Sequence, residues 1–141
     1  MIFKNTKESA SLLSQKIAEE LSLNSNNSLL CYINPDSKDF CQLVADSLKL
    51  NISFLPNTIT GIDPKNTLYL LIIDNGDTRA VEYNEYTDIL RKKIPETQII
   101  IAAPVIAQSE EEILKNCSDR LIALHVEPYF FSVSQFYQKK S

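Results

Sequence analysis

Short apolar runs alternate with amphipathic segments along this chain, and that alternation restricts its fold more than any other feature. The clearest apolar run is 68–73, Leu-Tyr-Leu-Leu-Ile-Ile, which leads directly into a polar turn. A run of this kind is typical of a strand that is buried on both faces of a sheet. Four further segments are predicted to be strands: 29–33, 52–54, 99–103 and 121–126.

The segments between these runs have helical character. In residues 6–22 apolar side chains recur every three or four positions, and Asn5 and Glu8 form a candidate N-terminal cap pair. Ser109 and Glu112 form a capping-box pair at the start of the last predicted helix. Other helices are predicted over 37–49 and 79–93, and a loop over 56–66.

Strands separated by helical segments of about ten to fifteen residues predict parallel pairing, with helices on both faces of the sheet. The 141 residues suffice for one core, and no repeat or linker divides them. The predicted fold class is α/β, a single three-layer domain over 1–141 with a mainly parallel central sheet. Ligands bind beyond the carboxyl ends of such strands, so 34–37, 74–80 and 104–108 are candidate loops.

Composition and charge exclude several classes of protein. The net charge is −4, and the basic runs are short, at 91–93 and 139–140. Nucleic-acid binding needs a basic face, so we expect no nucleic-acid partner. No apolar run approaches the ~20 residues that span a bilayer, and the N-terminus has no apolar secretion signal. We therefore expect no membrane association and a cytoplasmic location.

The cysteines and the histidine are expected to be structural. Cys31, Cys41 and Cys117 are odd in number, widely spaced and set in apolar segments, which predicts buried free thiols rather than a disulfide framework or a zinc site. His125 is the only histidine and lies in the last predicted strand. Because no nucleophile is recognisable beside it, no catalytic residue and no metal ligand are assigned.

The turn after the strand at 68–73 resembles the substrate loop of the type I phosphoribosyltransferases. This turn consists of Asp74, Asn75, Gly76, Asp77, Thr78 and Arg79. The resemblance extends to 29–48, 101–105 and 128–137, so it covers nearly the whole chain in the family's order. In that family two acidic residues hold the ribose hydroxyls of phosphoribosyl pyrophosphate (PRPP), and a Thr-Gly-Thr loop binds the 5′-phosphate at a helix N-terminus.

This turn departs from the family pattern. Asp74 matches the first acidic residue and Gly76 matches the turn glycine, whereas Asn75 replaces the second acid. The expected Thr, Gly and Thr are replaced by Arg79, Ala80 and Glu82. A one-residue deletion would instead place Thr78 on the first threonine. The resemblance therefore implies a degenerate PRPP loop, in which Arg79 is the remaining group able to make a bidentate phosphate contact.

The family's pyrophosphate loop, typically Pro-Arg-Gly-Gly, is also degenerate here. It corresponds to Pro35, Asp36, Ser37 and Lys38, so an acid replaces the arginine and both glycines are lost. The chain has only two glycines, against an average usage near 7%, which leaves none to build a second phosphate cradle.

These departures favour a phosphoribosyltransferase-like domain that is catalytically degenerate and has a binding, regulatory or assembly role. Four acids would lie near one crevice and repel an anionic substrate by about 1–4 kcal/mol per close contact. These are Asp36, Asp74, Asp77 and Glu82. The alternative is an active enzyme that transfers the phosphoribosyl group of PRPP to a base or other nucleophile with Mg²⁺, using Asp74 and Thr78. A third interpretation is a stand-alone α/β interaction module.

Two partners are predicted for this domain. The family's habit of dimerising, together with the aromatic segment 128–137, predicts a homodimer. A small phosphorylated ligand is the other candidate. No cofactor is assigned beyond the Mg²⁺ that the active alternative requires.

Overall fold

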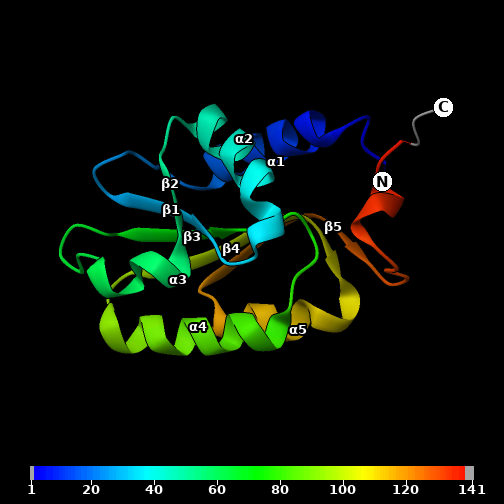
Figure 1. Cartoon of the computed structure of the whole chain (residues 1–141). Coiled ribbons are helices and arrows are strands. Elements are labelled where there is room, and N and C mark those ends of the chain that lie inside the picture. The colour runs from blue at the N-terminus through cyan, green and yellow to red at the C-terminus, as the bar shows by residue number, and fades with distance from the viewer. Residues whose placement is uncertain (1, 139–141) are drawn as a thin grey trace.

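The computed structural model describes residues 2–138 and confirms the three-layer α/β fold (Figure 1). Within those residues five strands form one sheet in the order β2-β1-β3-β4-β5, and every neighbouring pair is parallel. The strands are β1 (Ser28–Tyr32), β2 (Ile52–Phe54), β3 (Tyr69–Ile73), β4 (Gln98–Ala107) and β5 (Arg120–Glu127).

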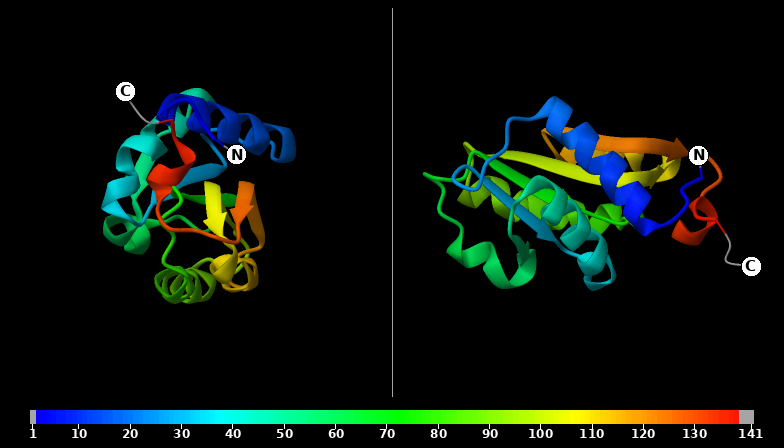
Figure 2. Two further views of the ribbon diagram at one scale, coloured as in Figure 1. Left: turned by 90° about the vertical axis from the view of Figure 1, so that its right-hand side faces the viewer. Right: turned by 90° about the horizontal axis from the view of Figure 1, so that it is seen from above.

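Helices cover both faces of this sheet, as Figures 1 and 2 show. One face packs against α1 (Thr6–Glu20) and α2 (Lys38–Leu48). The other packs against α3 (Leu55–Thr58), α4 (Ala80–Lys93) and α5 (Gln108–Cys117). The strand and helix predictions are therefore confirmed in type and order, with ends that move by one or two residues in most elements.

Strand β3 shows how the sheet joins its two cores. Leu70 and Ile72 are fully buried in the core under α4 and α5, whereas Leu71 and Ile73 are fully buried in the core under α1 and α2. Successive side chains of a strand point to opposite faces, so the next residue, Asp74, points toward α4. The strand thus directs a carboxyl group toward one of the two cores.

Two sequence predictions about loops are wrong. The segment 56–66 is not a loop throughout, because α3 and the 3₁₀ helix Ile59–Gly61 occupy its first half. Pro56 lies in the first turn of α3, where its missing N–H costs nothing. The segment 104–108 is not an open loop either, since β4 continues to Ala107 by pairing with β5 and α5 begins at Gln108.

The predicted capping pairs have different outcomes. Asn5 does cap α1, and its side chain accepts a hydrogen bond from the Glu8 N–H. The Ser109 and Glu112 pair does not cap α5, because that helix begins at Gln108 and its N-cap is Ala107, two residues before Ser109. The uninterrupted pairing of β4 leaves no extended residue at Ser109 that could act as a cap.

The C-terminal segment returns to the start of the chain. The Phe3 N–H donates to the Phe136 carbonyl at 2.6 Å, and the Gln138 N–H donates to the Phe3 carbonyl at 2.9 Å. Phe3 and Phe136 are buried together against Val105 of β4. The first and last described segments therefore lie side by side, as the two views of Figure 2 show.

No helix within residues 2–138 has the length and apolar character needed to cross a membrane. The basic run at 91–93 forms the last turn of α4, where positive charges are stabilised by the helix dipole. The second basic run, 139–140, lies outside the described residues.

We expect Phe136→Ala to lower the free energy of unfolding by about 3–5 kcal/mol, because it leaves a cavity between Phe3 and Val105. Phe131→Ala removes the same side chain from an exposed position and is the matched control, with an expected change within about 0.5 kcal/mol. Urea unfolding at low protein concentration measures both values. Equal losses in the two variants would contradict the described packing of the C-terminal segment.

Candidate functional site

The two loops that resemble phosphoribosyltransferase loops meet at the carboxyl end of the sheet. They follow β1 and β3, which are neighbours although β2 lies between them in the chain. This is the point where strand order reverses, and doubly wound sheets bind ligands there. The backbone N–H of Asn75 donates to Oγ of the buried Ser37 at 3.1 Å, so the structure ties the predicted loops together.

A pocket of about 370 Å³ opens at this junction. Asp36 comes from the first loop, and Asn75 and Asp77 come from the second. The remaining wall is the C-terminal segment Phe130, Phe131, Ser132, Val133 and Ser134. The pocket therefore combines two carboxylates and an amide with an aromatic and hydroxyl-bearing wall.

Asp74 does not face this pocket. Its side chain is fully buried, Oδ1 accepts the Gly76 N–H at 2.8 Å, and Oδ2 accepts the Tyr83 hydroxyl at 2.6 Å. Burial raises the pKa of Asp74 to about 6, although both hydrogen bonds act in the opposite direction; Asp77 and Glu110 raise it further. Both carboxylate oxygens already have partners inside the chain, so Asp74 is not free to hold ribose hydroxyls.

Glu110 occupies the place where the resemblance implies a phosphate. The Thr78 hydroxyl donates to Glu110 Oε2 at 2.6 Å, and the Ala80 N–H, at the start of α4, donates to Oε1 at 3.3 Å. The N-terminus of a helix attracts anions through its free N–H groups and its dipole. Here that anion is a carboxylate from the first turn of α5, supplied by the chain itself.

Gly76 has a structural role that replaces the expected close approach to phosphate. Its φ is +123°, and a Cβ at this position would lie 2.6 Å from Val105 Cγ2 and 3.2 Å from the Val105 carbonyl. The turn therefore packs directly on β4, and the glycine is needed for that contact.

The other predicted residues lie at the surface of the junction or support it. Pro35–Ser37 form a 3₁₀ turn that is capped by Asn34, whose side chain accepts the Asp36 N–H. Lys38 begins α2 and is exposed. Arg79 is exposed at the N-cap position of α4, one residue before the helical turn in which the sequence predicted it.

These groups do not fit Mg²⁺ or PRPP as the resemblance implies them. Within residues 2–138 no group of three or more His, Cys, Asp or Glu side chains is placed to hold a metal ion. Asp74 and Thr78, which the active alternative requires, are both bound to other side chains of the protein.

The remaining candidates are the three cysteines and His125, and each lies among packing residues of the fold. Cys31, Cys41 and Cys117 are free and buried, as predicted, and burial raises the pKa of Cys41 to about 12. The thiolate needed for nucleophilic chemistry is therefore suppressed. His125 Nε2 lies 2.7 Å from Glu127 Oε2 on the same strand, with its ring against Phe136.

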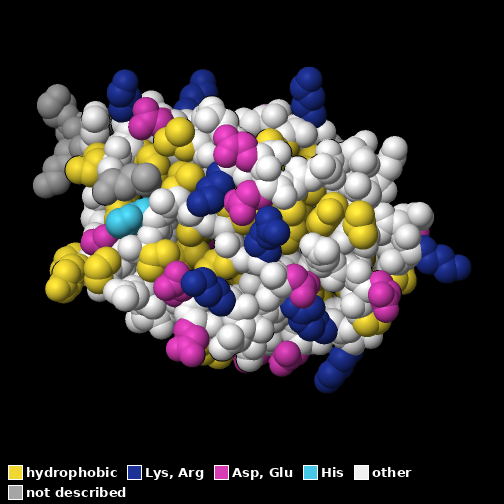
Figure 3. Space-filling view, turned by 180° about the vertical axis from the view of Figure 1, so that it is seen from behind, with side chains coloured by type: hydrophobic (Ala, Val, Ile, Leu, Met, Phe, Trp, Pro, Cys, Tyr) yellow, Lys and Arg dark blue, Asp and Glu magenta, His cyan; other side chains and the backbone are white. Residues whose placement is uncertain are grey.

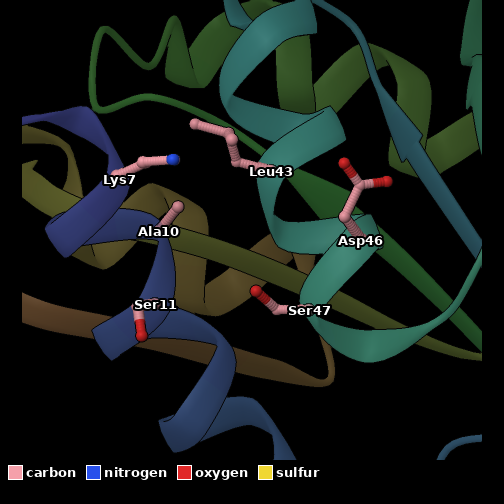
Figure 4. A pocket seen from close by; sticks show the side chains of 6 residues that line it. All are labelled: Lys7, Ala10, Ser11, Leu43, Asp46 and Ser47. Carbon is pink, nitrogen blue, oxygen red and sulfur yellow. The ribbon is translucent and has the colours of Figure 1, made fainter.

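A second pocket, of about 500 Å³, lies between α1 and α2, away from the two loops. Its walls are Lys7, Ala10, Ser11, Leu43, Asp46 and Ser47. Figure 4 shows Lys7 and Asp46 on either side of Leu43. Neither candidate loop contributes to these walls, so this pocket is separate from the loop junction.

The sequence did not identify Tyr83 and Glu110 as the hydrogen-bond partners of the turn after β3. The helical spacing predicts that Tyr83 packs inward, but the partner of its hydroxyl could not be inferred from spacing alone. Glu110 lies 30 residues beyond Ala80 and carries no local signal. Only the packing of α4 beside α5 brings the carboxylate to the helix start.

Comparison with known proteins finds a solved structure with a similar fold. The crystal structure of TT1426 from Thermus thermophilus superposes with a TM-score of 0.71 over 97% of this chain and 90% of that chain, at 14% sequence identity. This similarity shows the fold alone. No family model matches the sequence, and no curated protein matches it significantly.

We expect the buried carboxyl of Asp74 to make stability depend on pH. Its pKa in the folded protein, about 6, exceeds the ordinary value of 3.8, so its contribution is full below about pH 4 and is lost as pH rises through 6. Asp74→Asn keeps an acceptor for Gly76 and a polar partner for Tyr83 but does not titrate. Relative to this variant, the wild type should lose about 2–3 kcal/mol between pH 4 and pH 7 in urea unfolding.

The matched control for this pH dependence is Asp88→Asn, since Asp88 is exposed on α4. Its stability difference from the wild type should stay nearly constant over the same range. A constant difference for Asp74→Asn as well would show that Asp74 is not buried as described.

Replacing each of the two glycines with alanine should have different effects on the free energy of unfolding. Gly76→Ala should cost roughly 2–4 kcal/mol, because the positive φ and the contact with Val105 both penalise a Cβ. Gly61→Ala is the matched control, since a Cβ there meets nothing within 4 Å, and it should be neutral or stabilise by up to about 1 kcal/mol. Thermal and urea unfolding test both; a neutral Gly76→Ala would contradict the packing of this turn on β4.

Proposed function

We propose that this chain is a phosphoribosyltransferase-like domain that does not transfer phosphoribosyl groups and has a binding, regulatory or assembly role as a homodimer. The observation that carries the proposal is Glu110, whose carboxylate accepts hydrogen bonds from Thr78 and Ala80 at the start of α4. A substrate phosphate would have to displace this carboxylate, which is covalently part of the fold. The site therefore has an internal anion where catalysis would need an external one.

The charges around the junction support the same conclusion. Asp36 and Asp77 line the pocket, and Glu110 accepts a hydrogen bond from Thr78 of the second loop. PRPP carries several negative charges, and each close contact with a carboxylate costs about 1–4 kcal/mol, depending on exposure. The exposed Arg79 and Lys38 offset part of this repulsion, but neither belongs to the walls of the pocket.

The alternative of an active transferase has no geometric support at Asp74 or Thr78, because their side chains are already hydrogen bonded within the protein. It is retained as an outcome of the binding experiment. The third interpretation, an interaction module with incidental resemblance, shares the prediction of no PRPP binding in the wild type.

We expect the wild-type protein to bind PRPP no more tightly than about millimolar, even with Mg²⁺, in isothermal titration calorimetry. Glu110→Gln, together with Asn75→Asp, Arg79→Thr, Ala80→Gly and Glu82→Thr, should give measurable binding. These changes weaken the internal anion and restore the second acid, the close backbone approach and the hydroxyls.

The same variant with Glu110 retained separates the internal anion from the loop chemistry and should bind more weakly. Glu112→Gln is the charge-matched control, because Glu112 is exposed on the same helix, and it should have no effect. Failure of the full variant to bind would favour the interaction module. Micromolar binding by the wild type that Asp74→Ala abolishes would instead favour the active enzyme.

A further inference from the structure

Large apolar side chains are exposed at the carboxyl end of the sheet. Phe131 is 86% exposed and Tyr129 is 75% exposed, both in the segment that follows β5. Val81, in the first turn of α4 at this same end of the sheet, is 70% exposed. Figure 3 shows apolar side chains gathered at the end of the molecule that carries His125. Exposed aromatic residues of this size are typical of interfaces rather than of free surfaces.

Charged groups of both signs lie in or next to the pocket that Phe131 lines. Asp36 and Asp77 line the pocket beside Phe131, and Arg79 follows Asp77 by two residues. Within residues 2–138 none of these three side chains takes part in an ion pair. An acidic pocket and an unpaired arginine therefore lie next to each other on one face.

We propose that this face binds a second copy of the chain, and that Arg79 of each copy enters the acidic pocket of the other between Asp36 and Asp77. The inference rests on the assembly role in the proposed function and specifies its interface. The planar guanidinium suits these groups, because it pairs with carboxylates through two parallel hydrogen bonds and stacks on aromatic rings such as Phe131.

The arrangement suits a two-fold dimer in particular. In such a dimer the same patch appears on both sides, so each feature must meet its complement within one small area. The Cα atoms of Asp77 and Arg79 are at most about 7 Å apart, which allows two reciprocal contacts close to the axis. The exposed Phe131, Tyr129 and Val81 then supply the apolar area that charges alone lack.

This interface would also give the pocket an occupant. The partner's Arg79 would pair with the two carboxylates and occupy the space in front of the second loop, so that an anionic substrate would meet a filled pocket. Assembly and substrate exclusion would thus depend on the same residues.

The test is the oligomeric state, measured by sedimentation equilibrium at high micromolar concentration. The wild type should have twice the 16.0 kDa mass of the chain. Arg79→Glu and Phe131→Ser should each raise the dissociation constant by about tenfold or more, since every substitution acts twice in a symmetric dimer. The double variant Arg79→Glu with Asp77→Arg should recover much of the lost affinity, because it restores the charge pairing in reverse.

Lys65→Glu is the matched control, because it makes the same charge change at an exposed position before β3, at the opposite end of the sheet. It should leave the mass unchanged, and circular dichroism should show every variant folded, since all the substituted side chains are exposed. A monomeric wild type, or a dimer that neither Arg79→Glu nor Phe131→Ser weakens, would overturn the inference. A monomeric protein that still fails to bind PRPP would overturn this inference and leave the proposed loss of transfer standing, because Glu110 contacts Thr78 and Ala80 within one chain.

Discussion

The burial of β3 on both faces is the constraint on which the rest of this structure depends. Its four inner side chains, Leu70 to Ile73, alternate between two cores and are completely removed from water. The alternation continues into Asp74, which is carried beneath α4. A buried carboxyl must have hydrogen-bond partners, and the chain supplies Tyr83 and the Gly76 amide. The turn after β3 is therefore organised around an acid that faces inward.

The same inward organisation explains why residues that match the family pattern need not form a phosphate site. Gly76 is needed as a glycine because the turn presses against Val105. Thr78 is needed as a hydroxyl donor because its hydrogen bond holds Glu110. Each residue that matches the family pattern thus has an internal reason to be present, and the match alone does not imply a ligand.

The sequence predicted the architecture well because hydrophobic periodicity is a local signal. The run at 68–73 and the helical spacing in 6–22 each identify an element within a short window. The errors arose where tertiary contacts decide the outcome. Residues 105–107 remain in a strand because β5 pairs with them, and Glu110 becomes important because α5 lies beside α4. The position of both candidate loops was predictable, whereas the partners of Asp74 and Thr78 were not.

An internal anion competes with an external one on unequal terms. Glu110 is held near the start of α4 by the packing of α5, so its effective concentration there is set by the fold and does not depend on any ligand. A phosphate carries more charge and would gain more from the helix dipole, yet the dipole contributes only about 0.3–1 kcal/mol and the neighbouring acids oppose it. In the proposed function, this balance makes Glu110 of α5, which lies outside the loop that carries the resemblance, a principal obstacle to phosphate binding. In the proposed function, the loss of phosphate binding therefore involves Glu110 of α5 together with the substituted residues of the two loops, while the hydrogen bonds of Asp74 hold the turn after β3.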